Sequence, residues 1–455
     1  MFEGLKSIHF VGIGGIGTSA LAKFFVHRGL RVSGSDLQVS DTTEECRRMG
    51  MKIFSGHAVG NVGEGVECVI YSPAVLETNP EREEAKRCGI PQMSYPEALG
   101  ELSKEYSTIA VCGTNGKSTT TAMLGRILVE AGYDPTVIVG TKVPDFPDGN
   151  LRMGKGRFFL LEACEYREHF LHLHPEMIVL TNIEADHLDY FRDLAHICAT
   201  FQAFANKLAG KGMLVWNGGD PTSRELRKGT AVSYGYGTDA DYAGFDRKAE
   251  SGRQRFSLRR STPEEELGSI SLSVPGLFNV QNALAAAVAA MELGVPVETV
   301  RHALETFPGV WRRFERVGTW HEAKVISDYG HHPTAIAQTL AGAREFFPGR
   351  RIILCFQPHQ HARTKALFDR FVDAIAQADV SVVLEIYAVA GRTESDDVSS
   401  KDLVRAIHSR FLSAASHYTP DLDHAESVLR DLVRPGDVLI VQGAGDVDTL
   451  ARRLV

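Results

Sequence analysis

The sequence lacks a long hydrophobic run, a disulfide framework and an excess of positive charge. Its 455 residues include seven cysteines, an odd number, scattered along the chain without a C-x-x-C pair. Such cysteines are typical of reduced thiols in a cytoplasmic protein rather than of disulfides or a zinc site. No apolar stretch could cross a bilayer, and the chain enters a strand pattern at once, without a signal peptide. We therefore expect a cytoplasmic protein with no membrane partner.

The charge balance excludes a further class of partner. The net charge of −8 argues against a nucleic acid bound by electrostatics. Anionic substrates would then need local positive groups from lysine, arginine, magnesium or helix ends. The composition, 44% hydrophobic and 23% charged, is that of a globular protein. At this length, about three domains are expected.

Strand and helix patterns alternate through three successive units, which predicts an α/β fold with parallel sheets covered by helices on both faces. We place the domains at residues 1–106, 107–314 and 315–455. The polar, strand-like stretch 234–274 predicts a small antiparallel insertion in the second domain. Ligands are then expected at the carboxyl ends of the strands.

The most informative segment is a glycine-containing turn between an apolar strand, 108–112, and a helical segment, 120–131. It consists of Gly113, Thr114, Asn115, Gly116, Lys117, Ser118 and Thr119. Backbone N–H groups of such a turn bind phosphate, the lysine reaches the outer phosphates, and the serine hydroxyl can ligate Mg²⁺. The segment therefore predicts ATP binding, although Val111 stands where the usual pattern has its first glycine. The alternative is an ordinary glycine turn with a surface lysine.

A second glycine cluster, Gly12–Gly17, fits G-x-G-x-x-G after the strand 7–11. Asp36 ends the next strand, where a carboxylate could bind a ribose hydroxyl. Taken alone, the pattern indicates NAD or FAD, but the same turn suits any pyrophosphate. A tight turn needed only for packing is the alternative, so the identity of the ligand stays open.

Polar side chains follow two further apolar strands of the second domain. Glu162 follows 157–161, and the strand 177–182 leads to Asn182, Asp186, His187 and Asp189. Carboxylates at this edge could bind Mg²⁺, which prefers hard oxygen ligands. A helix cap, a solvated glutamate or a hydrogen-bonded loop would explain the same residues without a ligand.

The third domain carries basic residues and paired histidines. Arg312 and Arg313, at the boundary that precedes it, could contact a γ-phosphate or form surface ion pairs. The stretches 327–333 and 356–364 follow its first two strands and contain the histidines. No third ligand at zinc spacing accompanies them, so we expect them to orient substrate. The planar fork of Arg363 suits a carboxylate.

Together these residues resemble the Mur ligase family, the ATP-dependent amide ligases of peptidoglycan synthesis. The resemblance covers nearly the whole chain in the family's motif order, and is greatest to the alanine-adding members. Its main points are His9–Gly17, Asn182–Tyr190, Arg312–Glu315, Asp328–Pro333 and Phe356–His359. It implies a Rossmann-like N-terminal domain that binds a UDP-sugar and no dinucleotide, a central P-loop-type ATP-binding domain, and a Rossmann-like C-terminal domain for the amino acid.

The resemblance also implies roles for single residues. Lys117, Glu162, His187, Arg313 and His331 would be catalytic, and Ser118, Glu162 and His187 would be magnesium ligands. Besides the turn 113–119, the ATP site would include Asn279, Asn282, Arg313 and Asp328. The UDP-sugar site would comprise Gly14, Gly15, Ile16, Gly17, Asp36 and Ser72. His331, His359 and Arg363 would face the amino acid.

The implied substrates are ATP, UDP-N-acetylmuramate and L-alanine, with Mg²⁺ as cofactor and a monomer or weak homodimer as the assembly. The sequence departs from the alanine-adding pattern at Asn115, Ser118, Phe278 and Gln360, of which the last replaces an arginine near the expected amino-acid site. Three alternatives remain: a recycling ligase that adds a tripeptide, an NAD-dependent dehydrogenase, and a non-catalytic nucleotide-binding regulator.

Overall fold

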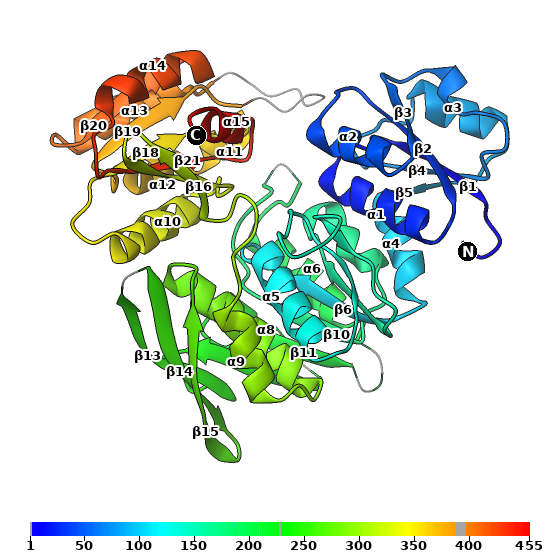
Figure 1. Ribbon diagram of the computed structural model, residues 1–455, viewed down its shortest axis with the longest axis horizontal. Helices are drawn as coiled ribbons and strands as arrows, with labels where there is room; N and C mark the ends of the chain where they lie inside the picture. The colour runs from blue at the N-terminus through cyan, green and yellow to red at the C-terminus, as the bar shows by residue number, and fades with distance from the viewer. Residues whose placement is uncertain are drawn as a thin grey trace. The chain divides into compact units, whose positions relative to one another are not determined.

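The computed structural model describes residues 2–188, 190–208, 210, 212–226, 229–250, 252–387 and 397–455 (Figure 1). The chain forms two compact units. Unit one comprises Met1–Asn182, Cys198–Ser233 and Ala285–Thr299, and unit two comprises Ile183–Ile197, Tyr234–Leu284 and Val300–Val455. The chain passes from one unit to the other directly after Asn182, and again within α6 (Leu194–Ala205), β12 (Ala231–Tyr236), α8 (Leu277–Glu292) and α9 (Val297–Glu305).

The first sheet of unit one is entirely parallel, in the order β3-β2-β1-β4-β5. Every residue of β1 is buried, as expected for a strand with neighbours on both sides and helices on both faces. The strand order reverses beside β1, and the glycine turn 12–15 follows that strand. The strands are β1 (Ser7–Val11), β2 (Arg31–Asp36), β3 (Lys52–Ser55), β4 (Cys68–Tyr71) and β5 (Gln92–Ser94). The helices are α1 (Ile16–His27), α2 (Asp41–Arg48), η1 (Val59–Asn61), α3 (Pro80–Arg87) and α4 (Tyr95–Ser103).

A second parallel sheet in unit one carries the phosphate turn. Its strands run in the order β11-β10-β6-β9-β7, and β8 is added antiparallel to β7. Strand β6 lies between β10 and β9, so the turn that follows β6 emerges in the middle of the sheet. The strands are β6 (Ser107–Cys112), β7 (Thr136–Ile138), β8 (Leu151–Arg152), β9 (Phe158–Glu162), β10 (Met177–Leu180) and β11 (Met213–Asn217). The helices are α5 (Lys117–Glu130), η2 (Tyr166–His172) and α7 (Pro221–Arg224).

Unit two contains a sheet in the order β16-β17-β21-β18-β19-β20, parallel except for β16. Successive residues of its strands point to opposite faces, and each face has its own apolar core: Val325 and Ile353 lie in one, Ile326 and Leu354 in the other. The strands are β16 (Glu315–Trp320), β17 (Ala323–Asp328), β18 (Ile352–Phe356), β19 (Val380–Leu384), β20 (Ala415–Thr419) and β21 (Val438–Gln442). The helices are α10 (Pro333–Phe346), α11 (His361–Ala366), α12 (Phe368–Ile375), α13 (Ser400–Arg410), α14 (Leu422–Leu432) and α15 (Val447–Arg453).

The α/β fold with parallel sheets is confirmed, and so is the antiparallel character of the insertion. Strands β13 (Tyr242–Glu250), β14 (Arg253–Ser261) and β15 (Glu264–Leu272) pair antiparallel, while β12 pairs parallel with β13. The sequence did not predict β16, β20 or α14. Both strands lie at sheet edges and are only partly buried, so they lack the apolar run by which the inner strands were found. In the described part of the chain, no helix is long and apolar enough to span a membrane.

A buried carboxylate connects three elements of the first sheet. Glu81, fully buried on α3, accepts hydrogen bonds from Ser35 (2.5 Å), Asn61 (2.6 Å) and the Ala58 N–H (3.2 Å), and lies 3.1 Å from Nε2 of His9. Burial alone would raise the pKa of Glu81, but these hydrogen bonds, first that with His9, outweigh it and lower the pKa to about 2. The charged form is therefore the stable one in the fold.

This shift predicts a pH dependence of stability. Because the folded-state pKa lies below the ordinary value of 4.5, the stabilisation is complete above pH 4.5 and is lost as the pH falls towards 2. Over this range Glu81 should contribute about 3 kcal/mol to the loss of unfolding free energy. Urea unfolding at a series of pH values should show a shallower acid dependence for Glu81→Gln than for the wild type. The exposed Glu83→Gln on the same helix controls for the change in charge; equal slopes for wild type and Glu81→Gln would contradict the prediction.

Candidate active site

The phosphate turn has a backbone that requires glycine at two positions. Gly113 has φ +132° and Gly116 has φ +85°, and Gly116 immediately precedes α5. A Cβ atom on Gly113 would lie 2.1 Å from Oγ1 of Thr181. The turn therefore brings its backbone close to the end of β10 and leads directly into the start of α5, and the N-terminus of a helix favours an anion.

Residues after β10 fix the shape of this turn. The Thr114 N–H donates to the carbonyl of Asn182 (2.9 Å), and the Asn115 N–H donates to its side-chain oxygen (3.0 Å). The Asn182 amide and the Thr181 hydroxyl donate to the carbonyl of Asn115, at 3.0 and 2.6 Å. Asn182 thus braces the turn from the side.

Lys117 lies across the turn and is paired with a carboxylate that the sequence analysis did not single out. Its ammonium group donates to the Gly113 carbonyl (2.6 Å) and to both oxygens of the buried Glu165 (3.0 and 3.1 Å). Burial alone would lower the pKa of Lys117, but the Glu165 carboxylate raises it above the usual value. Lys117 is therefore a permanent cation. The only feature of the sequence that could have indicated Glu165 is its position three residues after Glu162.

Ser118 and Glu162 provide two oxygens next to this cation. The Ser118 hydroxyl donates to Oε1 of Glu162 (3.1 Å), and the Gly140 N–H donates to Oε2 (2.8 Å). A hydroxyl and an oriented carboxylate at a helix N-terminus are hard ligands that suit Mg²⁺, which keeps several waters and phosphate oxygens in its shell. These two residues therefore fit the expected metal.

The first glycine turn gathers the expected UDP-sugar residues at the carboxyl ends of β1, β2 and β4. The Asp36 carboxylate accepts a hydrogen bond from the Gly14 N–H (2.8 Å), so it braces the turn. Ser72 follows β4, and a Cβ on Gly12 would lie 2.9 Å from its Cβ. Gly15 precedes α1, in which Ile16 and Gly17 form the first turn. A side chain on Gly17 would collide with the Tyr95 hydroxyl, at 2.7 Å.

In unit two, Asp328 organises the loop at the end of β17. It is buried, and its carboxylate accepts from the Phe314 N–H (2.8 Å) and the Gly330 N–H (2.7 Å). Burial raises its pKa. The Arg313 guanidinium lies 4.6 Å from the ring of Tyr329, in the same loop. The arrangement places Arg313 and Asp328 together, with Asp328 engaged by backbone groups.

Two of the histidines form a row with an aromatic ring. The rings of His331 and His359 are 5.8 Å apart, and His359 stacks on Tyr387 at 5.7 Å with an interplanar angle of 8°. Burial, reinforced by the charge of Arg363, lowers the pKa of His331 well below its ordinary value. His331 is therefore neutral at pH 7.

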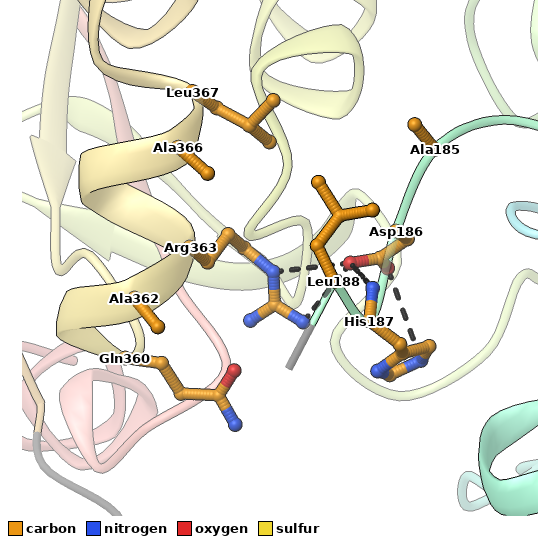
Figure 2. A pocket seen from close by; sticks show the side chains of 9 residues that line it. All are labelled: Ala185, Asp186, His187, Leu188, Gln360, Ala362, Arg363, Ala366 and Leu367. Carbon is orange, nitrogen blue, oxygen red and sulfur yellow. Dashed lines mark hydrogen bonds and ion pairs between the residues drawn. The ribbon is translucent and has the colours of Figure 1, made fainter. Parts of the chain in front are cut away.

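Figure 2 shows a small pocket in unit two. One of its lining residues, Arg363, lies 3.4 Å from Nδ1 of His359. Arg363 from α11 points into the pocket towards Asp186, and its Nε and Nη2 donate to one carboxylate oxygen of Asp186 at 3.2 and 3.1 Å. The remaining lining residues are Ala185, His187, Leu188, Gln360, Ala362, Ala366 and Leu367. Gln360 and Arg363, two positions expected near the amino acid, thus share one pocket.

Comparison with known proteins identifies the family. The sequence matches the Mur ligase family catalytic domain over residues 7–107, the Mur ligase middle domain over 111–290, and the Mur ligase glutamate ligase domain over 312–445. The chain belongs to the Mur ligase family.

Three relatives of this Mur ligase illustrate the similarity. It is 41% identical to the UDP-N-acetylmuramate–L-alanine ligase of Syntrophotalea carbinolica, over 98% of this chain and 97% of that protein. The crystal structure of the UDP-N-acetylmuramate–alanine ligase of Thermotoga maritima is similar with a TM-score of 0.85 and 30% identity, covering 98% of both chains. A murein peptide ligase from Psychrobacter arcticus shares the fold, with a TM-score of 0.74 and 23% identity over 99% of this chain and 98% of that one.

In this Mur ligase the expected site residues divide between the two units. Unit one contains the residues expected at the UDP-sugar, the phosphate turn and Glu162; unit two contains His187, Asn279, Asn282, Arg313, Asp328, His331, His359 and Arg363. The two asparagines are buried and hydrogen-bonded: Asn279 donates to the Pro275 carbonyl (2.7 Å) and Asn282 to the side-chain oxygen of Asn279 (3.2 Å). Asp189 lies outside the described residues.

The turn geometry predicts the effect of a single methyl group. Gly113→Ala should weaken nucleotide binding at least tenfold, because the new Cβ must displace Thr181 and with it the brace on Asn115. Titration with a fluorescent ADP analogue, together with thermal unfolding, measures both consequences. Gly132→Ala is the matched control, since Gly132 also has positive φ (+78°) but no neighbour within 4 Å of its Cβ position. Wild-type nucleotide affinity in Gly113→Ala would refute the assignment of this turn.

Proposed function

We propose that this Mur ligase joins L-alanine to the lactyl carboxylate of UDP-N-acetylmuramate at the expense of ATP, with release of ADP and phosphate. The observation that carries the proposal is the phosphate turn, which combines the Lys117 cation with the Ser118–Glu162 hydrogen bond. The full-length relatives with 41% and 30% identity, both named for this activity, support it.

The chemistry follows from the need to activate a carboxylate. Transfer of the γ-phosphate of ATP to the lactyl carboxylate forms an acyl phosphate, which the amine attacks with loss of phosphate. Lys117 binds the β- and γ-phosphates and offsets part of the charge of the two anions. Ser118, Glu162 and His187 would bind Mg²⁺, which offsets more of that charge when bound. Arg313 contacts the γ-phosphate.

Lys117 exchanges partners in this scheme. Before ATP binds, Glu165 and the Gly113 carbonyl occupy its ammonium group. A triphosphate competes for the same cation, and Glu165 keeps Lys117 charged and near the turn. The protein therefore has a formed cation at the site before the nucleotide arrives.

The amino acid fits the pocket of unit two. Arg363 and Asp186 present one positive and one negative group side by side, and an amino-acid zwitterion carries the complementary pair. We assign the substrate carboxylate to Arg363, and the two neighbouring histidines, His331 and His359, to the same site. The small pocket favours a short side chain such as that of L-alanine.

Three domains, at residues 1–106, 107–314 and 315–455, would close around the substrates and exclude water from the acyl phosphate.

All seven cysteines are free, which supports a reducing, cytoplasmic location. We expect a monomer or weak homodimer.

The recycling ligase is the second candidate, because the murein peptide ligase shares the fold. Purified protein with ATP, Mg²⁺ and UDP-N-acetylmuramate should be tested against L-alanine, glycine, L-serine and the murein tripeptide, by phosphate release and product mass. We expect the amide of L-alanine. A tripeptide product would support the recycling ligase, phosphate release without an amide product would exclude a ligase, and quenching of NADH fluorescence would indicate a dehydrogenase.

Removal of the turn cation should abolish catalysis without unfolding the protein. Lys117→Ala should lower kcat by at least about 10³-fold, because the cation that stabilises phosphoryl transfer is lost. Phosphate release and thermal unfolding measure activity and folding separately. Lys104→Ala, which removes only an exposed ion pair with Glu101, should leave kcat unchanged. A Lys117→Ala enzyme with wild-type ligation would overturn the proposed mechanism.

A further inference from the structure

A buried lysine connects the two sheets of unit one. Lys23 on α1 is only 1% exposed, yet its ammonium group donates to three oxygens. These are the Asp148 carbonyl (2.8 Å), the Asn150 side-chain oxygen (2.9 Å) and a carboxylate oxygen of Glu45 (3.1 Å). A buried ammonium is costly unless all its donors are satisfied, and here three acceptors are provided.

The partners of Lys23 come from both sheets. Glu45 lies on α2, which like α1 connects strands of the first sheet. Asp148 and Asn150 precede β8, a strand of the second sheet. Lys142, between β7 and β8, reaches the other oxygen of Glu45 (2.6 Å). We refer to these five residues as the Lys23 cluster.

Asn150 extends the cluster to the first turn of α1. It is 1% exposed, and its amide donates to the Ile16 carbonyl (2.6 Å) and to the Ser19 hydroxyl (2.9 Å). Since α1 begins directly after the glycine turn 12–15, this contact fixes the helix end that faces the expected UDP-sugar. The side-chain oxygen of Asn150 accepts from Lys23 and its side-chain nitrogen donates to α1, so the two sets of hydrogen bonds require this orientation of the amide.

The other end of the cluster leads to the phosphate site. Lys142 lies two residues after Gly140, whose N–H donates to Glu162 (2.8 Å). Glu162 in turn accepts from Ser118 at the start of α5. A continuous set of hydrogen bonds and short chain segments therefore joins the start of α1 to the start of α5.

We propose that Lys23 is a positioning residue: through Asn150 and Glu45 it fixes the start of α1 relative to Glu162 and Ser118, and so aligns the sugar-borne carboxylate with the γ-phosphate. This inference rests on the proposed function, because it requires one substrate at each helix end. Lys23 contacts neither substrate. Alignment matters because misplacement of reacting groups by about 1 Å can cost about 100-fold in rate.

The test separates alignment from binding and from stability. Lys23→Met keeps most of the side-chain volume and removes the charge, while Glu45 keeps Lys142 as a partner. We expect kcat for amide formation to fall about 10- to 100-fold, with Kd for ADP and for UDP-N-acetylmuramate within twofold of wild type. The measurements are steady-state kinetics at saturating substrates, titration calorimetry, and thermal unfolding to set an assay temperature at which all variants are folded.

Two further variants make the result decisive. Asn150→Asp keeps an acceptor for Lys23 but loses the donor to Ile16 and Ser19, so it should show the same fall in kcat. If Lys23→Met does not fold, the kcat of Asn150→Asp decides the question. Lys104→Met, which removes a lysine outside the cluster that forms an exposed ion pair with Glu101, should keep kcat within twofold of wild type.

Wild-type kcat in both Lys23→Met and Asn150→Asp would overturn the inference, as would a fall in substrate affinity with kcat unchanged. Failure of the proposed function would appear differently, as absence of ligation by the wild-type protein. Hydrogen exchange of the amides of residues 17–22 adds a readout independent of activity: it should be faster in Lys23→Met and Asn150→Asp than in the wild type, and equal rates would count against the inference.

Discussion

The ion pair between Lys117 and Glu165 is the interaction on which the candidate active site depends. Lys117 is the first residue of α5, and its side chain extends across the closely packed turn that precedes the helix. Burial at this position disfavours the charged form of the lysine. Glu165 offsets that cost and keeps the ammonium group beside the turn. Without this partner, partial burial would favour the uncharged form of Lys117, which lacks the affinity of an ammonium group for phosphate.

The turn itself depends on neighbours that are distant in sequence. Thr181 and Asn182, at the end of β10, bond to three backbone groups of Thr114 and Asn115. The same principle applies at the first glycine turn, where Asp36 at the end of β2 binds the Gly14 N–H. In both sheets, the carboxyl ends of parallel strands meet at one edge, so each glycine turn is braced by residues at the end of a neighbouring strand.

Unit two assembles a different kind of site. Arg363 and Asp186 satisfy each other's charge, while burial keeps His331 neutral. Such a pocket combines matched charges with uncharged hydrogen-bonding rings and aromatic surface, which suits a small zwitterion better than a phosphate. The two units therefore suit different ligands, because Lys117 is a permanent cation in unit one whereas the charge of Arg363 in unit two is balanced by Asp186.

The sequence by itself determined the α/β class, the inner strands, the phosphate turn and the family, because apolar runs and closely spaced motifs such as 113–119 are local. It missed the edge strands β16 and β20, whose partly exposed residues carry no apolar run. It also placed Asn182 and Asp36 near ligands, without indicating that they brace turns. Only the tertiary structure decided the pairing of Lys117 with Glu165, of Arg363 with Asp186 and of Lys23 with Asn150. These partners are separated by 48, 177 and 127 positions in the sequence, and no local pattern encodes which charged side chains meet when the strands assemble.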